Sequence, residues 1–414
     1  MAPVDRPTLS DTGLGAPFIA CVERLNLTNF RCYEQARIET GGRSVVLSGA
    51  NGAGKTNILE AISLLTPGRG LRRAKLVDMV RHHKNQTERE HENIWAVAAR
   101  VATPDGSIDL GTGLTEPGAT GRTVRIDGET VKNQSALSEY MDVQWLSPQM
   151  DRLFSDGKSA RRRFLDRLVF GYDPAHVGRI NAYDHAMRER AKLLRDASNS
   201  NSGSADGTWL ATLEDTMATK GVAVAAARLE LTERLGHYCA AVHGPFPGAS
   251  LSIEGDVEHW ISEGPALIAE DKMRAALFES RGPDAITGGA RTGPHRSDLL
   301  VRHLGKDQPA EICSTGEQKA LLISIVLADA RMTASERGRV PVLLLDEVAA
   351  HLDQERREAL FGELLELGAQ AWLTGTDPEL FASLSGHACF ISINDAILSP
   401  LQSSNPTLET VKQA

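Results

Sequence analysis

Residues 49–56, GANGAGKT, have the types and the spacing of a phosphate-binding loop. They match G-x-x-x-x-G-K-[ST] in full, a pattern in which glycines let backbone N–H groups surround a β-phosphate. Lys55 would reach the β- and γ-phosphates, and the hydroxyl of Thr56 would coordinate Mg²⁺. A chance Gly-rich turn is the alternative, but a short apolar run precedes the motif and a helical pattern follows it. The motif predicts a P-loop NTPase, a class that includes kinases, GTPases, helicases, transporters and chromosome proteins.

An acidic pair follows a second apolar run, VPVLLLDE at residues 340–347. A buried strand would place Asp346 and Glu347 at its C-terminal end, where ligands bind in a parallel sheet. Asp346 would then hold Mg²⁺ through water, and Glu347 would orient and polarise the attacking water. For an acidic pair taken alone, an ordinary solvated strand end is the alternative interpretation.

Residues 314–319, STGEQK, open a long apolar helix pattern. Free N–H groups and hydroxyls at a helix N-terminus bind anions, as in the signature segment of ABC-type ATPases. In that class the signature of one subunit completes the ATP site of another, so two nucleotides lie within a head-to-tail dimer. An ordinary N-cap is the alternative, with Ser314 or Thr315 as the cap and Glu317 completing a capping box.

Three weaker features also fit an ABC-type ATPase. Gln149 lies between the P-loop and a helical segment, as a Q-loop does, and Asp353 in AAHLD follows the acidic pair, as a D-loop does. Thr374 or Thr376 ends the next predicted strand, where these ATPases usually carry a switch His. Each feature taken alone is also typical of a helix cap or a strand end.

Strand and helix patterns alternate around these motifs and predict an α/β fold with a mostly parallel sheet. Residues 92–131 are β-rich, with a hairpin turn at Asp127-Gly128, and predict a small antiparallel sheet. A helical pattern of apolar residues begins at about residue 158, and a polar loop at 196–208 would lie at the tip of this helical lobe. The expected division is a disordered lead-in at 1–20, an ATPase lobe at 21–157 and 286–414, and an inserted, mainly helical lobe at 158–285.

Composition sets outer limits on the function. Hydrophobic content of 41% and charged content of 24% are ordinary for a globular protein, and no apolar run approaches the ~20 residues of a membrane helix. The five widely spaced cysteines include no CxxC, which favours a reduced, cytoplasmic protein. A net charge of −9 argues weakly against nucleic acid as a partner, but such a sum does not exclude local basic patches.

The distance in sequence between the P-loop and the signature segment distinguishes the subclasses of ABC-type ATPases. From Thr56 to Ser314 there are 258 positions, more than in transporter ATPases and fewer than in SMC-type proteins with their long coiled coils. With this spacing the chain resembles the RecF family of DNA repair ATPases over nearly all of its length after residue 20. The resemblance is carried by six segments: LNLTNFRCYE, GANGAGKTNILEAISLL, ARRRFLDR, RTGPHRSDL, STGEQKALLISIVLA and LLLDEVAAHLD. Where the family often has HRDD, this chain has HRSD.

The resemblance implies an ABC/SMC-like head with a short arm, which uses ATP and Mg²⁺ and dimerises on ATP. It implies slow ATP hydrolysis that acts as a switch, and binding of duplex DNA near gaps or junctions. It would help RecO- and RecR-like partners to load RecA, and it would be cytoplasmic and associated with the nucleoid. Alternatives are another SMC-like ATPase, of the defence or nuclease-associated kind, and a transporter ATPase subunit.

These expectations assign residues to roles. The expected ATP contacts are Arg31, Gly49, Ala50, Asn51, Gly52, Ala53, Gly54, Lys55, Thr56 and Asn57. Catalysis is assigned to Glu347, Lys55 and Gln149, and magnesium binding to Thr56, Asp346 and Gln149. The signature contacts made from a second subunit are Ser314, Thr315, Gly316 and Gln318, with Asp353 in the D-loop.

Two basic stretches are candidates for DNA contact. Residues 69–75, RGLRRAK, hold four basic residues and no acid, and residues 158–167 hold five basic residues and one acid. Such contacts would go mostly to phosphates and would be sensitive to salt. The candidate residues are Arg69, Arg72, Arg73, Lys75, Lys158, Arg161 and Arg162. Charge reversal of Arg72 and Arg73 is expected to weaken duplex binding, whereas a solvated helix face is preferred for residues 188–195.

Overall fold

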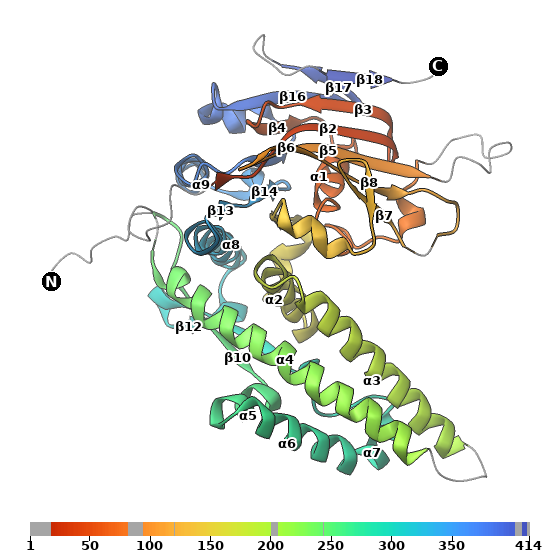
Figure 1. Cartoon of the computed structure of the whole chain (residues 1–414). Helices are drawn as coiled ribbons and strands as arrows, with labels where there is room; N and C mark the ends of the chain where they lie inside the picture. The colour runs from red at the N-terminus through yellow and green to blue at the C-terminus, as the bar shows by residue number, and fades with distance from the viewer. Residues whose placement is uncertain are drawn as a thin grey trace. The chain divides into compact units, whose positions relative to one another are not determined.

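A computed structural model describes residues 18–81, 94–119, 121–199, 206–242, 244–401 and 408–411. The chain divides into two compact units (Figure 1). One contains residues 1–150, 244–246 and 325–414, and the other contains residues 151–243 and 247–324. In the described ranges no helix has both the length and the apolar character that crossing a membrane requires. Each unit is considered by itself.

The first unit is built on a mixed sheet that carries the sequence motifs. In the described residues its strand order is β17-β16-β4-β15-β14-β9, and every neighbouring pair is parallel except β16 with β17. The strands are β4 (Ser44–Ser48), β9 (Val143–Leu146), β14 (Val342–Leu345), β15 (Ala371–Gly375), β16 (Ala388–Asn394) and β17 (Ile397–Pro400). All four residues of β14 are buried, as expected for an apolar run within a parallel sheet. This arrangement brings the ends of β4, β14 and β15 to one edge.

A second sheet of the same unit is antiparallel. Its order in the described segments is β18-β3-β2-β5-β6-β7-β8. The strands are β2 (Cys21–Phe30), β3 (Tyr33–Glu39), β5 (Trp95–Thr103), β6 (Gly106–Leu114), β7 (Thr123–Ile126), β8 (Glu129–Val131) and β18 (Leu408–Val411). Asp127 and Gly128 have φ values of 48° and 83° in the β7–β8 turn, as the hairpin signal predicts. The sheet is larger than the pattern at 92–131 suggests, because β2 and β3 join it.

Helix α1 (Lys55–Ser63) lies in the hydrophobic core that both sheets share. Ile58, Leu59 and Ile62 are fully buried and belong to the same cluster as Leu25 of β2 and Val45 of β4. The P-loop helix is therefore fixed by packing. The other long helices of the motifs are α8 (Thr315–Arg337) and α9 (Gln354–Glu366).

The second unit combines helices with a small sheet. Its helices are α2 (Lys158–Tyr172), α3 (His176–Asn199), α4 (Gly207–Ala240), α5 (Asp256–Glu263), α6 (Ala266–Glu279) and α7 (Arg281–Thr287). Strands β10 (Ala249–Glu254), β11 (Asp298–His303) and β12 (Gln308–Pro309) form an antiparallel sheet. Strand β10 is not expected within the helical lobe at 158–285, although its sequence ASLSIE alternates apolar and polar residues; its partner β11 lies far along the chain.

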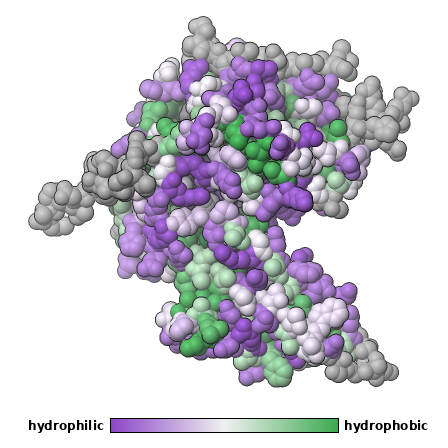
Figure 2. Space-filling view, viewed as in Figure 1, coloured by the Kyte–Doolittle hydropathy of each residue, from purple (hydrophilic) through white to green (hydrophobic). Residues whose placement is uncertain are grey.

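The core of this unit lies between α3, α4, α5 and α6, and includes Tyr183, Met217 and Met273. Not all large apolar side chains are buried there. Leu267 and Ile268 of α6 are 66% and 49% exposed. Figure 2 shows hydrophobic surface, drawn in green, over α5 and α6.

Several boundaries differ from the sequence-based expectation. The compact units divide near residues 151 and 324 rather than 158 and 285, because β11 pairs with β10 and therefore groups with the helices. Residues 148–152, which include Gln149, form a short 3-10 helix ahead of the helical lobe. Phe18 and Ile19 form strand β1, which pairs with β13 (Arg339–Val340), so two residues of the expected lead-in at 1–20 belong to a strand. Helix α3 extends to Asn199 and α4 begins at Gly207, so residues 196–199 and 207–208 of the expected loop are helical. Residues 1–17 and 200–205 lie outside the described residues.

Candidate nucleotide-binding site

The P-loop connects β4 to α1 through a backbone that needs glycine. Gly49, Gly52 and Gly54 have φ values of 152°, 82° and 117°. A Cβ at Gly49 would lie 2.2 Å from the carbonyl oxygen of Ile393, and one at Gly54 would lie 2.7 Å from the hydroxyl of Tyr33. Gly54 also caps α1 without a side-chain hydrogen bond, which leaves N–H groups of the first turn available for an anion.

Lys55 is buried beside this loop. Its Nζ donates hydrogen bonds to the carbonyl oxygens of Gly49, at 2.6 Å, and Ala50, at 3.0 Å. Burial lowers the pKa of Lys55, and the carboxylates of Glu347 and Asp346 act in the opposite direction by favouring its charged form. The ammonium group is thus held at the loop, within the field of the acidic pair.

Thr56 meets Asp346 although 290 positions separate them in the chain. The Thr56 hydroxyl lies 2.9 and 3.1 Å from the two carboxylate oxygens of Asp346, which follows β14. Burial raises the pKa of Asp346, whereas hydrogen bonds from Thr374 and Thr56 lower it. A hydroxyl and a carboxylate at one point are hard oxygen donors of the kind that Mg²⁺ prefers. The two residues therefore fit the predicted magnesium site.

Glu347 has an unusual backbone conformation. Its φ is 55°, in the left-handed region that residues with a Cβ seldom adopt, and its N–H donates to the hydroxyl of Thr374 at 2.9 Å. Its side chain is partly exposed and acts electrostatically on Lys55. The carboxylate therefore favours the charged form of the P-loop lysine.

Gln149 lies on an exposed stretch after β9, the strand that pairs with β14 in parallel. Because the two strands are parallel, the segment of Gln149 begins at the same edge of the sheet as Asp346. Asp353 caps α9 by accepting a hydrogen bond from the N–H of Arg356 at 2.8 Å. The cap confirms a local structural role for Asp353, and its role in a D-loop stays a prediction.

Arg31 and Arg72 share one buried carboxylate, that of Glu60 on α1. Arg31 makes a bidentate pair with it at 2.8 and 2.7 Å, and Arg72 approaches it to 3.2 Å. Arg72 also donates to Asn57 at 2.7 Å. Glu60 is fully buried, so it depends on both cations. The sequence interpretation missed this residue; an acid within the apolar pattern NILEAI is the signal that could have identified it.

This network changes the interpretation of the basic stretch 69–75. Arg69, Arg72 and Lys75 are all exposed, but the guanidinium of Arg72 is engaged by Glu60 and Asn57. Reversing the charge of Arg72 would set two carboxylates against each other beside the P-loop helix. The expected effect of that reversal on DNA binding therefore could not be separated from damage to the nucleotide site.

The signature segment has the geometry of a capping box. The N–H of Ser314 donates to Glu317 at 3.0 Å, and the N–H of Glu317 approaches the Ser314 hydroxyl at 3.4 Å. Lys306 pairs with Glu317, and these bonds lower the pKa of Glu317 to about 2. The capping box proposed as an alternative is thus present, and Thr315 and Gly316 remain exposed beside it.

Gln318 does not fit the role of a signature contact made to a second subunit. It is 4% exposed, and its amide nitrogen donates to the carbonyl oxygens of Glu311 and Cys313 at 3.2 and 3.0 Å. Its oxygen accepts from Ser155 at 3.1 Å. We reassign Gln318 to holding the loop before α8 in place.

The second basic stretch is also partly engaged. Arg161 makes a bidentate pair with buried Asp298 at 2.8 and 2.9 Å, and Arg162 donates to the carbonyl oxygen of Ser297 at 2.6 Å. Lys158 is exposed and lies 3.9 Å from Asp298. Arg161 and Arg162 are therefore better explained as internal contacts than as DNA contacts.

The same contacts bring together two segments of the family resemblance, residues 160–167 and 291–299. A different contact, made by the side chain of Ser297, explains HRSD in place of HRDD. The Ser297 hydroxyl donates to buried Glu258 at 2.7 Å, and an aspartate at 297 would put a second carboxylate against it. Serine at 297 is thus matched to Glu258 in this chain.

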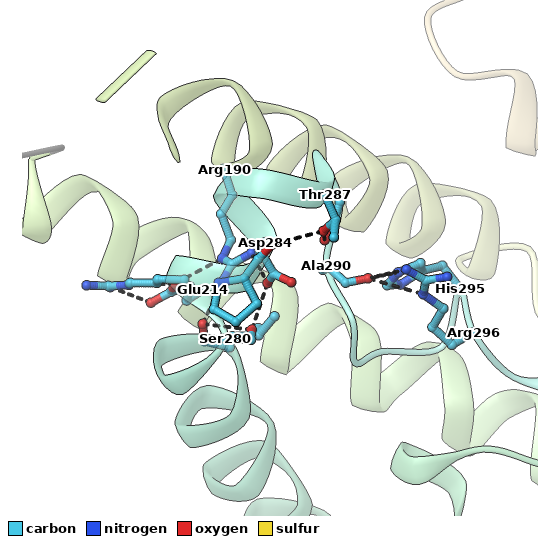
Figure 3. Close-up of polar contacts among 12 residues, drawn as sticks. Arg190, Glu214, Ser280, Asp284, Thr287, Ala290, His295 and Arg296 are labelled. Atoms are coloured by element: carbon cyan, nitrogen blue, oxygen red, sulfur yellow. Dashed lines mark hydrogen bonds and ion pairs between the residues drawn. The ribbon is translucent and has the colours of Figure 1, made fainter. Parts of the chain in front are cut away.

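Buried polar contacts continue through the helical unit (Figure 3). Arg190 is 1% exposed and bonds to Glu214 at 3.0 Å and to Asp284 at 2.8 Å. Ser280 donates to Asp284 at 2.7 Å. Both carboxylates around Arg190 are paired, which is the condition under which buried charges are tolerated. These residues stabilise the junction of α3, α4 and α7.

His295 is held in a neutral form. Its Nε2 lies 2.9 Å from the carbonyl oxygen of Ala290, which can only accept, so Nδ1 must accept from the hydroxyl of Tyr183 at 2.6 Å. Burial is the main cause that lowers the pKa of His295, to about 4, and nearby Arg296 acts in the same direction.

Acid is expected to destabilise the helical unit through His295. Between the unfolded pKa of about 6.5 and the folded pKa of about 4, the unfolded chain binds a proton that the folded chain does not. The free energy of unfolding therefore decreases as the pH is lowered through this range. From pH 7 to pH 5 the loss should be about 1–2 kcal/mol. Urea unfolding of the natural chain and of His295→Gln at both pH values measures it. Equal losses in the two proteins would contradict the assignment.

Comparisons with known proteins agree with one another. Residues 21–387 match a family model described as the RecF/RecN/SMC N terminal domain. The chain is 48% identical to the DNA replication and repair protein RecF of Mesorhizobium japonicum, over 92% of this chain and 98% of the relative. It is also 48% identical to the RecF of Caulobacter vibrioides, over 92% and 99%.

Solved structures show a similar fold. The recombination mediator protein RecF-ATPrS of the RecFOR pathway matches with a TM-score of 0.80 and 21% identity, covering 94% of this chain and all of that one. The corresponding RecF-ATP structure matches with a TM-score of 0.77, covering 94% of this chain and 99% of that one. At this identity the likeness shows the fold.

Proposed function

This chain belongs to the RecF family of DNA replication and repair proteins, and we propose that it binds DNA under the control of ATP during recombinational repair. The observation that carries the proposal is the contact of Thr56 with Asp346 beside the start of α1, where the cap residue Gly54 offers no side-chain hydrogen bond. A phosphate-binding helix terminus and a pair of Mg²⁺-type ligands at one point are what a nucleoside triphosphate requires.

We assign the phosphates to the backbone of residues 49–54 and to Lys55. The Lys55 ammonium, now bonded to two loop carbonyls, is close enough to exchange those bonds for phosphate oxygens. Thr56 and Asp346 would hold Mg²⁺, which when bound neutralises phosphate charge; Gln149 stays a predicted third ligand. Arg31 lies two positions before Tyr33, which contacts the P-loop, and would contact the nucleotide while Glu60 fixes its guanidinium.

The reaction proposed is slow hydrolysis of ATP. Glu347 is the carboxylate that would accept a hydrogen bond from the attacking water and so increase its nucleophilicity. Its backbone is in the left-handed region directly after β14, and its carboxylate favours the charged form of Lys55. Hydrolysis would act as a switch between two states of the protein rather than as a motor.

The exposed residues Ser314, Thr315 and Gly316 support the proposal that a second copy of the chain closes each ATP site. They leave a hydroxyl and helix N–H groups facing solvent at the start of α8. A relative with this fold is named as a mediator in the RecFOR pathway. By that likeness we propose RecO- and RecR-like partners, and RecA loading near single-strand gaps.

A binding assay with three labelled DNAs tests the function. Duplex, single-stranded and gapped DNA are titrated with the chain, with and without ATP and Mg²⁺. ATP-dependent binding that favours duplex or gapped DNA is expected, with an apparent affinity that falls steeply as salt rises. Binding that is the same with and without ATP would contradict an ATP-controlled DNA-binding protein.

Charge reversal of Arg69 and Lys75 is expected to weaken duplex binding about tenfold. It should also flatten the salt dependence, because binding with fewer phosphate contacts releases fewer counterions. Unlike Arg72, these exposed residues are not paired with Glu60. Binding of a fluorescent ATP analogue should not change.

The matched control reverses Arg188 and Lys192, two exposed residues of α3, and changes the net charge equally. Equal weakening by both pairs would mean that total charge, and not the stretch 69–75, governs DNA affinity.

A further inference from the structure

We propose that Thr374 is the positioning residue that sets the direction of Glu347. This proposal rests on the proposed ATPase function and adds a residue to that site. The sequence leaves Thr374 and Thr376 as equal candidates. The structure separates them, because Thr376 is exposed whereas Thr374 has no exposed surface.

The hydroxyl of Thr374 joins the two acidic residues. It donates to Oδ1 of Asp346 at 2.8 Å and accepts from the backbone N–H of Glu347 at 2.9 Å. A threonine hydroxyl has one proton and two lone pairs, so both bonds can form at once. One buried atom therefore fixes the side chain of Asp346 and the backbone of Glu347 together.

Strand pairing explains why this hydroxyl is at the right place. Strand β15 lies between β4 and β14 in the sheet. Thr374 is opposite Leu47 of β4, and Leu373 is opposite Leu345 of β14, one residue before Asp346. The hydroxyl is thus supplied by a rigid central strand, and not by a loop, at the edge where Thr56 reaches the same carboxylate.

The backbone of Glu347 needs such a support. A φ of 55° is costly for a residue with a Cβ and persists only where neighbouring contacts enforce it. The hydrogen bond from its N–H to Thr374 is a contact of this kind. If it is lost, the residue can relax toward an extended conformation, which would point its carboxylate elsewhere. Hydrolysis would then slow while the P-loop, and with it nucleotide binding, is left in place.

The test compares Thr374→Val, which has the same shape without the hydroxyl, with Thr374→Ser, which keeps it. Thr374→Val should lower kcat about tenfold or more, because a lost outer-shell hydrogen bond typically has that effect. Its Kd for a fluorescent ATP analogue should stay within about threefold of the natural chain, and Thr374→Ser should keep both values within about threefold.

A double variant tests whether Thr374 acts through Glu347. In a Glu347→Gln background, Thr374→Val should slow hydrolysis no further, because the group that it positions is already inactive. Thermal melting confirms that each variant is folded, and Thr374→Ala replaces Thr374→Val if valine prevents folding.

Three results would overturn the role of Thr374: natural kcat in Thr374→Val, equal impairment in Thr374→Ser, or additive losses in the double variant. These differ from failure of the proposed function. If the natural chain does not hydrolyse ATP, both proposals fall, whereas natural hydrolysis that survives Thr374→Val removes only the positioning role.

Discussion

Glu347→Gln is expected to bind ATP with unchanged affinity and to hydrolyse it about a hundredfold more slowly. Glutamine has the size of glutamate and can still occupy the strained position after β14, but it cannot accept the proton of an attacking water. A hundredfold loss corresponds to about 2.7 kcal/mol of activation free energy, within the range for loss of a general base. The variant should also hold the proposed ATP-bound dimer for longer, since the step that ends it is slowed.

Phosphate release under single-turnover conditions measures the rate, and mass measurement with ATP reports the dimer. Glu355→Gln is the matched control, because it makes the same chemical change at an exposed position in the first turn of α9. If Glu347→Gln hydrolyses ATP as fast as the control, Glu347 is not the catalytic carboxylate.

Lys55→Met is expected to lose nucleotide binding and the ATP-dependent dimer together. Methionine approximates the length of lysine but makes no charged hydrogen bonds to phosphate. Two such bonds contribute about 3 kcal/mol, so the Kd for ATP should rise about a hundredfold or more. The remaining acidic pair, Asp346 and Glu347, would then repel the phosphates without the opposing ammonium group.

Titration with a fluorescent ATP analogue measures this loss. Lys75→Met, a change of the same kind at an exposed lysine outside the P-loop, should bind the analogue normally. Lys55 also bonds to the carbonyls of Gly49 and Ala50, so thermal melting must accompany the titration. A folded Lys55→Met with natural affinity would exclude Lys55 from phosphate binding.

The hairpin at Asp127-Gly128, the buried strand β14 and the glycine loop before α1 are all predictable from short stretches of sequence. Each depends on local chemistry: positive φ values that suit glycine, an apolar run long enough for a buried strand, or a turn pair between alternating residues. The family resemblance adds the order of the motifs. Helices α5 and α6 lie within the expected helical lobe at 158–285, whereas strand β10 is not expected there, although ASLSIE alternates apolar and polar residues.

Which charges remain available for a partner cannot be predicted in this way. Arg72 and Arg69 look alike in RGLRRAK, yet only Arg72 pairs with buried Glu60. Arg161 is one of three adjacent arginines, yet its charge is matched by Asp298, which lies 137 positions away. Periodicity carries no information about such pairs, since they form only when distant segments pack together.

The phosphate-binding chemistry of the P-loop therefore depends on consecutive residues, whereas the position of the two acidic residues depends on how the sheet folds. Glycines, Lys55 and Thr56 follow one another, so their backbone conformations and side-chain types are enough to predict a phosphate site. The choice of Thr374 over Thr376 depends on strand register, which brings one hydroxyl to both Asp346 and the N–H of Glu347. Register is set by burial across the whole sheet, and no single stretch of the chain contains it.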